Sequence, residues 1–315
     1  MTSQVHIYSP QATAVDAYLA IQASRYAHVS AGVIILYDHI ITFDQEVSLI
    51  WHEPVSLGKF LFLSSRYYAF FCTMFDFYAL ISPPNLNSVS TEVYRWQGWT
   101  SIVITILAQA ILQLRIYALY SKNKRVLITM GILFILSISG SALVMTGILS
   151  RLTGVLYRIP PLGEFCMHNF TKLRIYYTFW IPSIAFDVFL SVLAISKSFR
   201  LRRALVRSSF RHTGEKLVDV FFRDSAIYFV VITATYITCM LVWIIGRSNL
   251  TELPLGFAIA FPCVVCNRMI LNLRGIRQRS SPSQTGVNLS TVNYGTSPSF
   301  GFAVHNQTEN LTYLS

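Results

Sequence analysis

Ionisable side chains inside apolar stretches are the residues of this sequence that could do chemistry. Asp38 is one of them, because it lies in an apolar run that ends near Phe43. A charged group at membrane depth is energetically costly, so it needs a partner or a function there. The other candidate residues in or beside apolar stretches are the ionisable Arg66, Arg115, Asp187, Asp224 and Arg268 and the polar Asn267. They predict either a polar switch between helices or a static network of buried charges.

Seven apolar segments must position these side chains. Most of them approach the ~20 residues that a helix needs to cross a bilayer. The composition agrees, because 53% of the residues are hydrophobic and only 12% are charged, about half the charged fraction of a soluble domain. The sequence therefore predicts an all-α integral membrane bundle of seven transmembrane helices. We place them at about 26–43, 60–81, 99–120, 126–149, 174–196, 222–246 and 253–273.

The distribution of Lys and Arg predicts the orientation of this bundle. The loops after the first, third and fifth segments, together with the C-terminal tail, hold about twice as many Lys and Arg residues as the other loops, and basic loops stay in the cytoplasm. We therefore expect the N-terminus outside and the C-terminus in the cytoplasm. This argument does not distinguish the plasma membrane from an internal membrane.

The chain divides into one membrane domain and two polar ends. The domain covers about residues 26–275, and residues 1–25 are expected to form an exposed tail. Residues 276–315 are rich in Ser, Thr, Asn and Gln, with few aliphatic side chains. Such a composition cannot bury enough apolar surface to fold. We expect a disordered cytoplasmic tail there.

Asp38 and Arg66 are predicted to form an ion pair. At a rise of 1.5 Å per residue, Asp38 lies about 9 Å from the cytoplasmic end of the first helix, and Arg66 about 10 Å from the cytoplasmic start of the second. Antiparallel neighbours would therefore hold the two residues at one depth. Asp44 and Glu46 are expected in the turn beyond the first helix.

The sequence lacks the patterns of common catalytic and metal sites. Its seven histidines do not cluster, and it contains neither His-Glu-x-x-His nor a Gly-rich phosphate loop. Cys263 and Cys266 have CxxC spacing, but without a second ligand pair they are expected to be two buried thiols. No predicted helix holds an internal Lys for a retinal Schiff base. We expect no enzymatic activity, no metal and no cofactor.

The loop after the fifth segment is strongly basic over about residues 197–221. It begins with the four candidate lipid-binding residues Lys197, Arg200, Arg202 and Arg203. Basic side chains beside a membrane attract the anionic lipids of the inner leaflet. The alternative is that they only set the topology. Nucleic acid is not an expected partner, although the net charge is +11, because apolar runs separate the basic residues.

The stretch from Leu36-Tyr37-Asp38 to Trp51, followed by 56–63 and Arg66-Tyr67, resembles the family of domain of unknown function 6533. Further similarity lies at 114–120, 222–229 and 267–274. The resemblance implies a multi-pass membrane protein of mushroom-forming fungi. It implies no activity, because the family has no assigned biochemical function.

Two functions from different classes fit these observations. The first is a receptor-like or sensory protein with a cytosolic signalling partner, suggested by the seven helices, the polar residues of the cytoplasmic half and the basic loop. The second is a transporter or channel for a small solute or ion, in which the intramembrane charges would line a path. The odd number of helices and the lack of an internal repeat count against transport.

Overall fold

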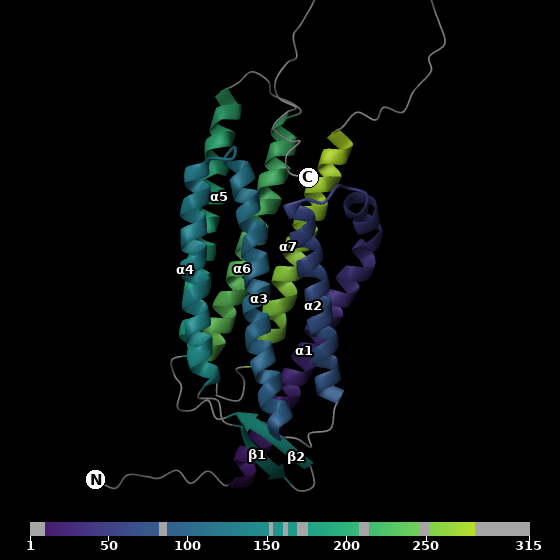
Figure 1. Ribbon diagram of the computed structural model, residues 1–315, viewed down its shortest axis with the longest axis vertical. Helices are drawn as coiled ribbons and strands as arrows, with labels where there is room; N and C mark the ends of the chain where they lie inside the picture. The colour runs from purple at the N-terminus through teal and green to yellow at the C-terminus, as the bar shows by residue number, and fades with distance from the viewer. Residues whose placement is uncertain are drawn as a thin grey trace, which may run out of the picture.

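Seven long α-helices run side by side in one elongated bundle (Figure 1). The structure is a computed structural model that describes residues 10–81, 87–150, 154–159, 163–168, 176–207, 214–245 and 252–280. Within these residues, the helices are α1 (Pro10–Glu46), α2 (Leu57–Ile81), α3 (Asn87–Leu119), α4 (Lys124–Leu149), α5 (Trp180–Arg207), α6 (Gly214–Ile245) and α7 (Leu255–Ser280). A 3-10 turn, η2 (Tyr176–Phe179), leads into α5.

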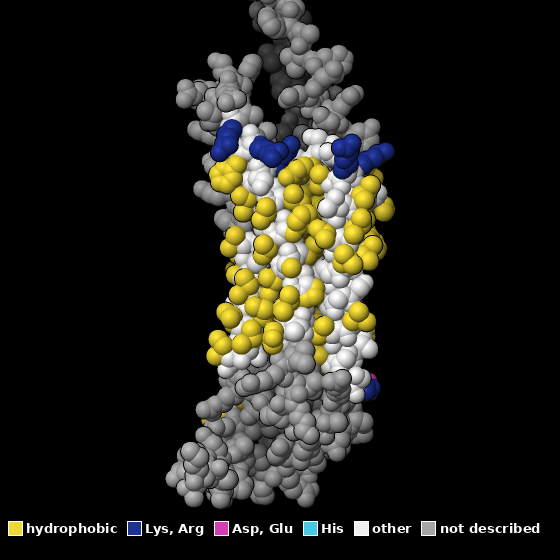
Figure 2. All heavy atoms as spheres, turned by 90° about the vertical axis from the view of Figure 1, so that its left-hand side faces the viewer, with side chains coloured by type: hydrophobic (Ala, Val, Ile, Leu, Met, Phe, Trp, Pro, Cys, Tyr) yellow, Lys and Arg dark blue, Asp and Glu magenta, His cyan; other side chains and the backbone are white. Residues whose placement is uncertain are grey.

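Six of these helices, all except α2, are long and apolar enough to cross a membrane. The exception, α2, carries the ionisable residues Arg66 and Asp76 within its apolar sequence. Hydrophobic side chains also cover much of the face of the bundle that Figure 2 shows. On α4, for example, Ile128 is 60% exposed and Leu143 is 74% exposed. Such a surface fits lipid tails and not water, and the chain is a helical, multi-pass membrane protein.

The two ends of the bundle differ. One end carries a two-stranded antiparallel sheet that the sequence did not predict, formed by β1 (Gly154–Ile159) and β2 (Gly163–His168). We call it the hairpin end, and α1 begins there (Figure 1). At the opposite end α7 finishes. We call this the basic end, after Lys59, Lys122, Lys124, Arg125 and Lys197.

The helices extend beyond the predicted segments. α1 begins at Pro10, inside the stretch expected to be an exposed tail, and Ala20 and Ser24 on it are buried. α7 continues to Ser280, past the predicted end of the membrane domain. The N-terminal residues 1–9 and the predicted tail from 281 onward lie outside the described residues.

Small residues let α1 approach α2 and α7 closely. A Cβ atom added at Gly32 of α1 would lie 2.5 Å from the ring of Phe77 and 2.8 Å from Thr73, both on α2. A Cβ atom at Gly256 of α7 would lie 3.1 Å from the Cβ of Ala31 on α1. Small residues play this role in membrane bundles because they allow helix backbones to pack tightly. These contacts bring the polar side chains of α1, α2 and α7 within reach of one another.

Candidate functional site

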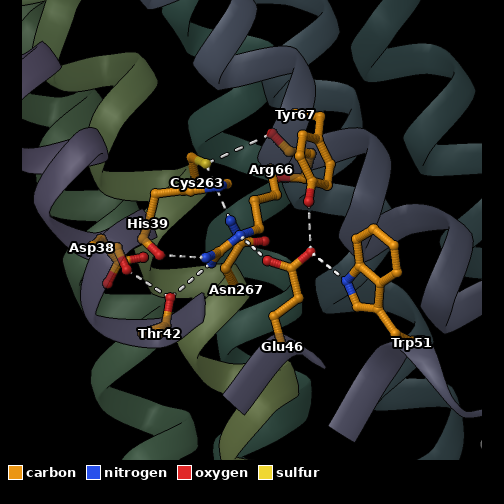
Figure 3. Close-up of polar contacts among 10 residues, drawn as sticks. Asp38, His39, Thr42, Glu46, Trp51, Arg66, Tyr67, Cys263 and Asn267 are labelled. Carbon is orange, nitrogen blue, oxygen red and sulfur yellow. Dashed lines mark hydrogen bonds and ion pairs between the residues drawn. The ribbon is translucent and has the colours of Figure 1, made fainter. Parts of the chain in front are cut away.

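Arg66 of α2 lies at the centre of a buried polar network with α1 (Figure 3). Its Nε atom lies 2.7 Å from Oε2 of Glu46, and the two side chains are only 2% and 0% exposed. Nη1 donates a hydrogen bond to Oγ1 of Thr42 at 2.9 Å, and Nη2 donates one to the carbonyl oxygen of His39 at 3.0 Å. The guanidinium also lies over the ring of Phe62, 5.6 Å from its centroid. Arg66 therefore binds α1 over about two helical turns.

Glu46 is held by two further donors. Its Oε1 atom accepts hydrogen bonds from the hydroxyl of Tyr67 at 2.9 Å and from Nε1 of Trp51 at 3.1 Å. Trp51 reaches Glu46 because the chain continues α1 as a π-helix, η1 (Val47–Trp51). A π-helix pairs residue i with residue i+5, and Trp51 lies five positions after Glu46. Short π-helical turns are frequent at functional sites.

Asp38 pairs with α7. Its Oδ1 atom accepts a hydrogen bond from Nε of Arg268 at 2.6 Å. The Asp38 side chain is 5% exposed and that of Arg268 is 46% exposed. Thr42 connects this pair to Arg66, because its hydroxyl donates to the carbonyl oxygen of Asp38 at 2.6 Å and accepts from Arg66. We call Asp38, Thr42, Glu46, Arg66 and Arg268 the charge lock.

The predicted ion pair between Asp38 and Arg66 is wrong. Arg66 pairs with Glu46, and Asp38 pairs with Arg268. The reason is the direction of the side chains, since every Cα–Cβ bond tilts toward the N-terminus of its own helix. Because α1 and α2 are antiparallel, Arg66 leans toward the basic end and Asp38 leans away from it. Asp38 and Arg66 therefore do not pair, although their backbones were expected at the same depth, because their side chains lean in opposite directions.

Glu46 is the residue of this candidate site that the sequence argument missed. It was expected in a turn, but α1 continues through it and buries it completely. A signal for this position exists in the sequence. Asp38, Thr42 and Glu46 follow each other at intervals of four residues, which places them on one face of a continuous helix.

Contacts near the lock also join α7 to α1 and α2. Nη1 of Arg274 donates to the carbonyl oxygen of Leu49 at 3.0 Å. Asn267 donates to the sulfur of Cys263 at 3.3 Å, and this thiol donates to the carbonyl oxygen of Ser65 at 3.6 Å. The predicted pair of buried thiols is confirmed, because Cys263 and Cys266 are both buried and free. The lock and these contacts make one junction of three helices.

The remaining predicted switch residues do not share this junction. Asp187 is buried on α5, where its Oδ1 atom accepts a hydrogen bond from Gln109 of α3 at 3.0 Å. Arg115 lies on α3 and is buried, with 9% of its surface exposed. The side chain of Asp224, on α6, lies outside the described residues.

A second polar cluster lies on the same helices toward the hairpin end. Nδ1 of His28 is 3.8 Å from Oδ2 of Asp76, and these side chains are 7% and 12% exposed. Gln97 of α3 donates to Oδ1 of Asp76 at 3.4 Å. Ala31, Ile35, Ala69, Ile104, Ile259, Ala260 and Cys263 form a buried, mostly apolar cluster that separates it from the charge lock.

Among the described residues, no group of three or more His, Cys, Asp or Glu side chains could hold a metal ion. The chemistry that the charge lock can perform is exchange of ionic partners. Arg66 is in direct contact with the carboxylate of Glu46. Asp38 carries a second carboxylate, and Thr42 links Asp38 to Arg66 through hydrogen bonds.

The segment that builds the α1–α2 side of the lock also matches a known family. The model of DUF6533, a family of unknown function, matches residues 26–71. This match supports the family resemblance. The matched segment contains Asp38, Thr42, Glu46 and Arg66, whereas Arg268 lies outside it. No curated protein matches the chain.

Proposed function

We propose that the protein is a receptor-like or sensory membrane protein without enzymatic activity. The observation that carries the proposal is the charge lock, with two ion pairs that join α1 to α2 and to α7. Buried ion pairs are poor devices for stability, because the desolvation of the charges offsets most of their attraction. They are suited to a switch, since an exchange of partners moves a helix between discrete positions.

The proposed topology has seven transmembrane helices, with the N-terminus outside and the C-terminus in the cytoplasm. α2 is the seventh crossing, and the burial of Arg66 against Glu46 lowers the cost of its charge in the membrane. The start of α1 and the end of α7 lie at opposite ends of the bundle (Figure 1), as an odd number of crossings requires. The basic end faces the cytoplasm, because loops rich in Lys and Arg remain there.

The proposed switch is a change of partner at Arg66. In one state Arg66 binds Glu46 while Arg268 binds Asp38. In the other, Arg66 binds Asp38, and both Glu46 and Arg268 become available at the cytoplasmic end. A signal would enter through the cluster of His28 and Asp76, since α1 and α2 carry both that cluster and the lock. A cytosolic signalling partner would then bind the exposed basic end.

A transporter or channel for a small solute or ion is the second candidate. The observation that favours it is the position of two polar clusters one above the other along α1 and α2. The apolar cluster between them, which includes Ile35 and Ile259, favours the receptor, because water and ions do not cross a packed apolar layer.

Two measurements on one preparation test the proposal. Spin labels at the exposed residues Val55 and Lys124, in a background with the native cysteines replaced, report the distance between the α1–α2 and α3–α4 connections. We expect two distances between the labels in Glu46→Gln. Asp44→Asn, which changes an exposed neighbour, should keep the single distance of the wild type. A single unchanged distance in Glu46→Gln contradicts the switch. Sustained ion or solute flux in reconstituted vesicles would favour the transporter instead.

A further inference from the structure

The turn between α3 and α4 is built in an unusual backbone conformation. Ser121 and Lys122 both have positive φ angles, 52° and 59°. Residues other than Gly rarely adopt this left-handed backbone conformation, which persists where surrounding contacts enforce it. Here the backbone N–H of Lys122 donates to the carbonyl oxygen of Tyr117 at 3.1 Å, and the side chain of Asn123 accepts from the N–H of Arg125 at 3.0 Å. The turn is thus fixed on both sides.

This turn presents three basic side chains at the surface. Lys122, Lys124 and Arg125 are all exposed. They lie within four residues, at the N-terminus of a 26-residue helix, where the helix dipole also favours anions. The positive charge is therefore concentrated at one corner of the basic end.

The end of α5 adds further basic side chains to the same corner. Nζ of Lys197 lies 5.3 Å from the centroid of the Tyr120 ring, and the hydroxyl of Tyr120 donates to the carbonyl oxygen of Leu193 at 3.1 Å. These contacts hold the α3–α4 turn against α5. Arg200 and Arg203 follow at intervals of three residues and are exposed. The side chain of Arg202, the fourth predicted lipid contact, lies outside the described residues.

Exposed apolar side chains lie near these charges along α4 and α5. On α4 they are Leu127 and Ile128, which are 41% and 60% exposed, and on α5 they are Ile195 and Phe199, 39% and 58% exposed. Figure 2 shows Lys and Arg side chains gathered along the rim of the apolar surface. The order from rim to centre, charge and then hydrocarbon, is that of a phospholipid.

Acidic residues are scarce in the elements that form this corner. Within α4, α5 and the turn between α3 and α4, the sole acidic residue is Asp187, which is buried. A topology signal needs only a general excess of Lys and Arg in the loop. It does not need a fixed turn, a Lys held over an aromatic ring, or exposed apolar side chains near the charges.

We propose that the α3–α4 turn and the end of α5 form a binding site for an anionic phospholipid. Lys122, Lys124, Arg125, Lys197 and Arg200 bind its phosphate-bearing headgroup, and the apolar side chains of α4 and α5 contact its acyl chains. Affinity should rise with headgroup charge, so a phosphoinositide should bind more tightly than phosphatidylserine, and phosphatidylcholine least tightly. This site is independent of the proposed switch, because it uses none of the residues of the charge lock.

The test measures lipids retained by the full-length protein in a neutral detergent. Native mass spectrometry, with equal amounts of phosphatidylcholine and phosphatidylserine added, should give about tenfold preference for the anionic lipid. The triple variant Lys122→Gln/Lys124→Gln/Arg125→Gln should lose most of this preference. The matched control is Arg95→Gln, which removes an exposed basic residue at the hairpin end and should leave the preference unchanged.

A second variant and a competition with inorganic phosphate complete the test. The variant Lys197→Gln/Arg200→Gln changes two residues of α5 and leaves the residues of the turn unchanged, so it tests the site if the triple variant fails to fold. Added inorganic phosphate tests whether a free anion occupies the same groups. Equal preference in wild type and both variants contradicts the proposal. So does displacement of the phosphatidylserine by phosphate at concentrations comparable to the lipid, because a free anion site needs no acyl chains.

Discussion

Arg66 and Glu46 lie 2.7 Å apart, on two different helices, with almost no exposed surface on either side chain. Only twenty positions separate them in the chain, and α1, η1 and α2 form one hairpin around them. The segment that matches DUF6533 contains both. The pair therefore belongs to a local unit, whereas the bond between Asp38 and Arg268 connects that unit to the last helix.

Replacing Glu46 should be strongly destabilising. Glu46→Gln removes the negative charge beside a buried Arg66, and an uncompensated buried charge costs about 3–5 kcal/mol. Unfolding in mixed micelles with increasing denaturing detergent measures this loss. Asp44→Asn is the matched control, since Asp44 is an exposed acidic residue two positions away, and it should change stability by less than about 0.5 kcal/mol. Similar losses in the two variants would refute the assignment of Arg66 to Glu46.

The pair of Asp38 and Arg268 should show unequal single losses and clear coupling. Asp38→Asn should cost more than Arg268→Gln, because Asp38 is buried while Arg268 is 46% exposed and can be hydrated when its partner is lost. The double variant should be more stable than the sum of the two losses predicts, by about 0.5–3 kcal/mol. A double-mutant cycle for Asp38 and Arg66 should give a smaller coupling energy than the cycle for Asp38 and Arg268. A larger coupling energy between Asp38 and Arg66 would support the ion pair that the sequence predicted.

The sequence predicted the helical membrane bundle, because long apolar segments separated by polar loops have few other solutions. It also identified Asp38, Arg66 and Arg268, since charged residues in apolar runs are conspicuous. It did not predict their partners, which depend on the direction in which each helix runs and on the position of α7 beside α1. It missed Glu46 because the end of a helix is read from falling hydropathy, and α1 continues through polar residues into a π-helix.

Replacing Gly32 by Ala, which adds only a methyl group, should destabilise the protein. Gly32→Ala places a Cβ atom 2.5 Å from the Phe77 ring and 2.8 Å from Thr73, so α1 and α2 must separate. We expect a loss of about 1–3 kcal/mol, the usual range for an overpacked core. Gly131→Ala is the matched control, because a Cβ atom there meets nothing within 4 Å on α4, and Ala favours the helix by about 1 kcal/mol. Equal thermal stability of the two variants would contradict this packing.

Glu252, in the turn before α7, should make stability depend on pH. Burial raises the pKa of its carboxyl from 4.5 to about 7. The folded state then binds more protons than the unfolded state between these values, so stability should fall as pH rises through this window and level off above it. Comparison with Glu252→Gln removes the contribution of every other titratable group.

The measurement for Glu252 is the melting temperature of the wild type and of Glu252→Gln between about pH 5 and pH 8. Near pH 5 the carboxyl is mostly protonated in the folded protein, so the two proteins should melt at similar temperatures. Toward pH 8 the wild type must ionise this carboxyl in its buried position, and Glu252→Gln should become the more stable of the two. A difference that stays constant across the range would mean that Glu252 does not titrate in this window. A difference of opposite sign would mean that its ionised form is stabilised by a partner in the folded state.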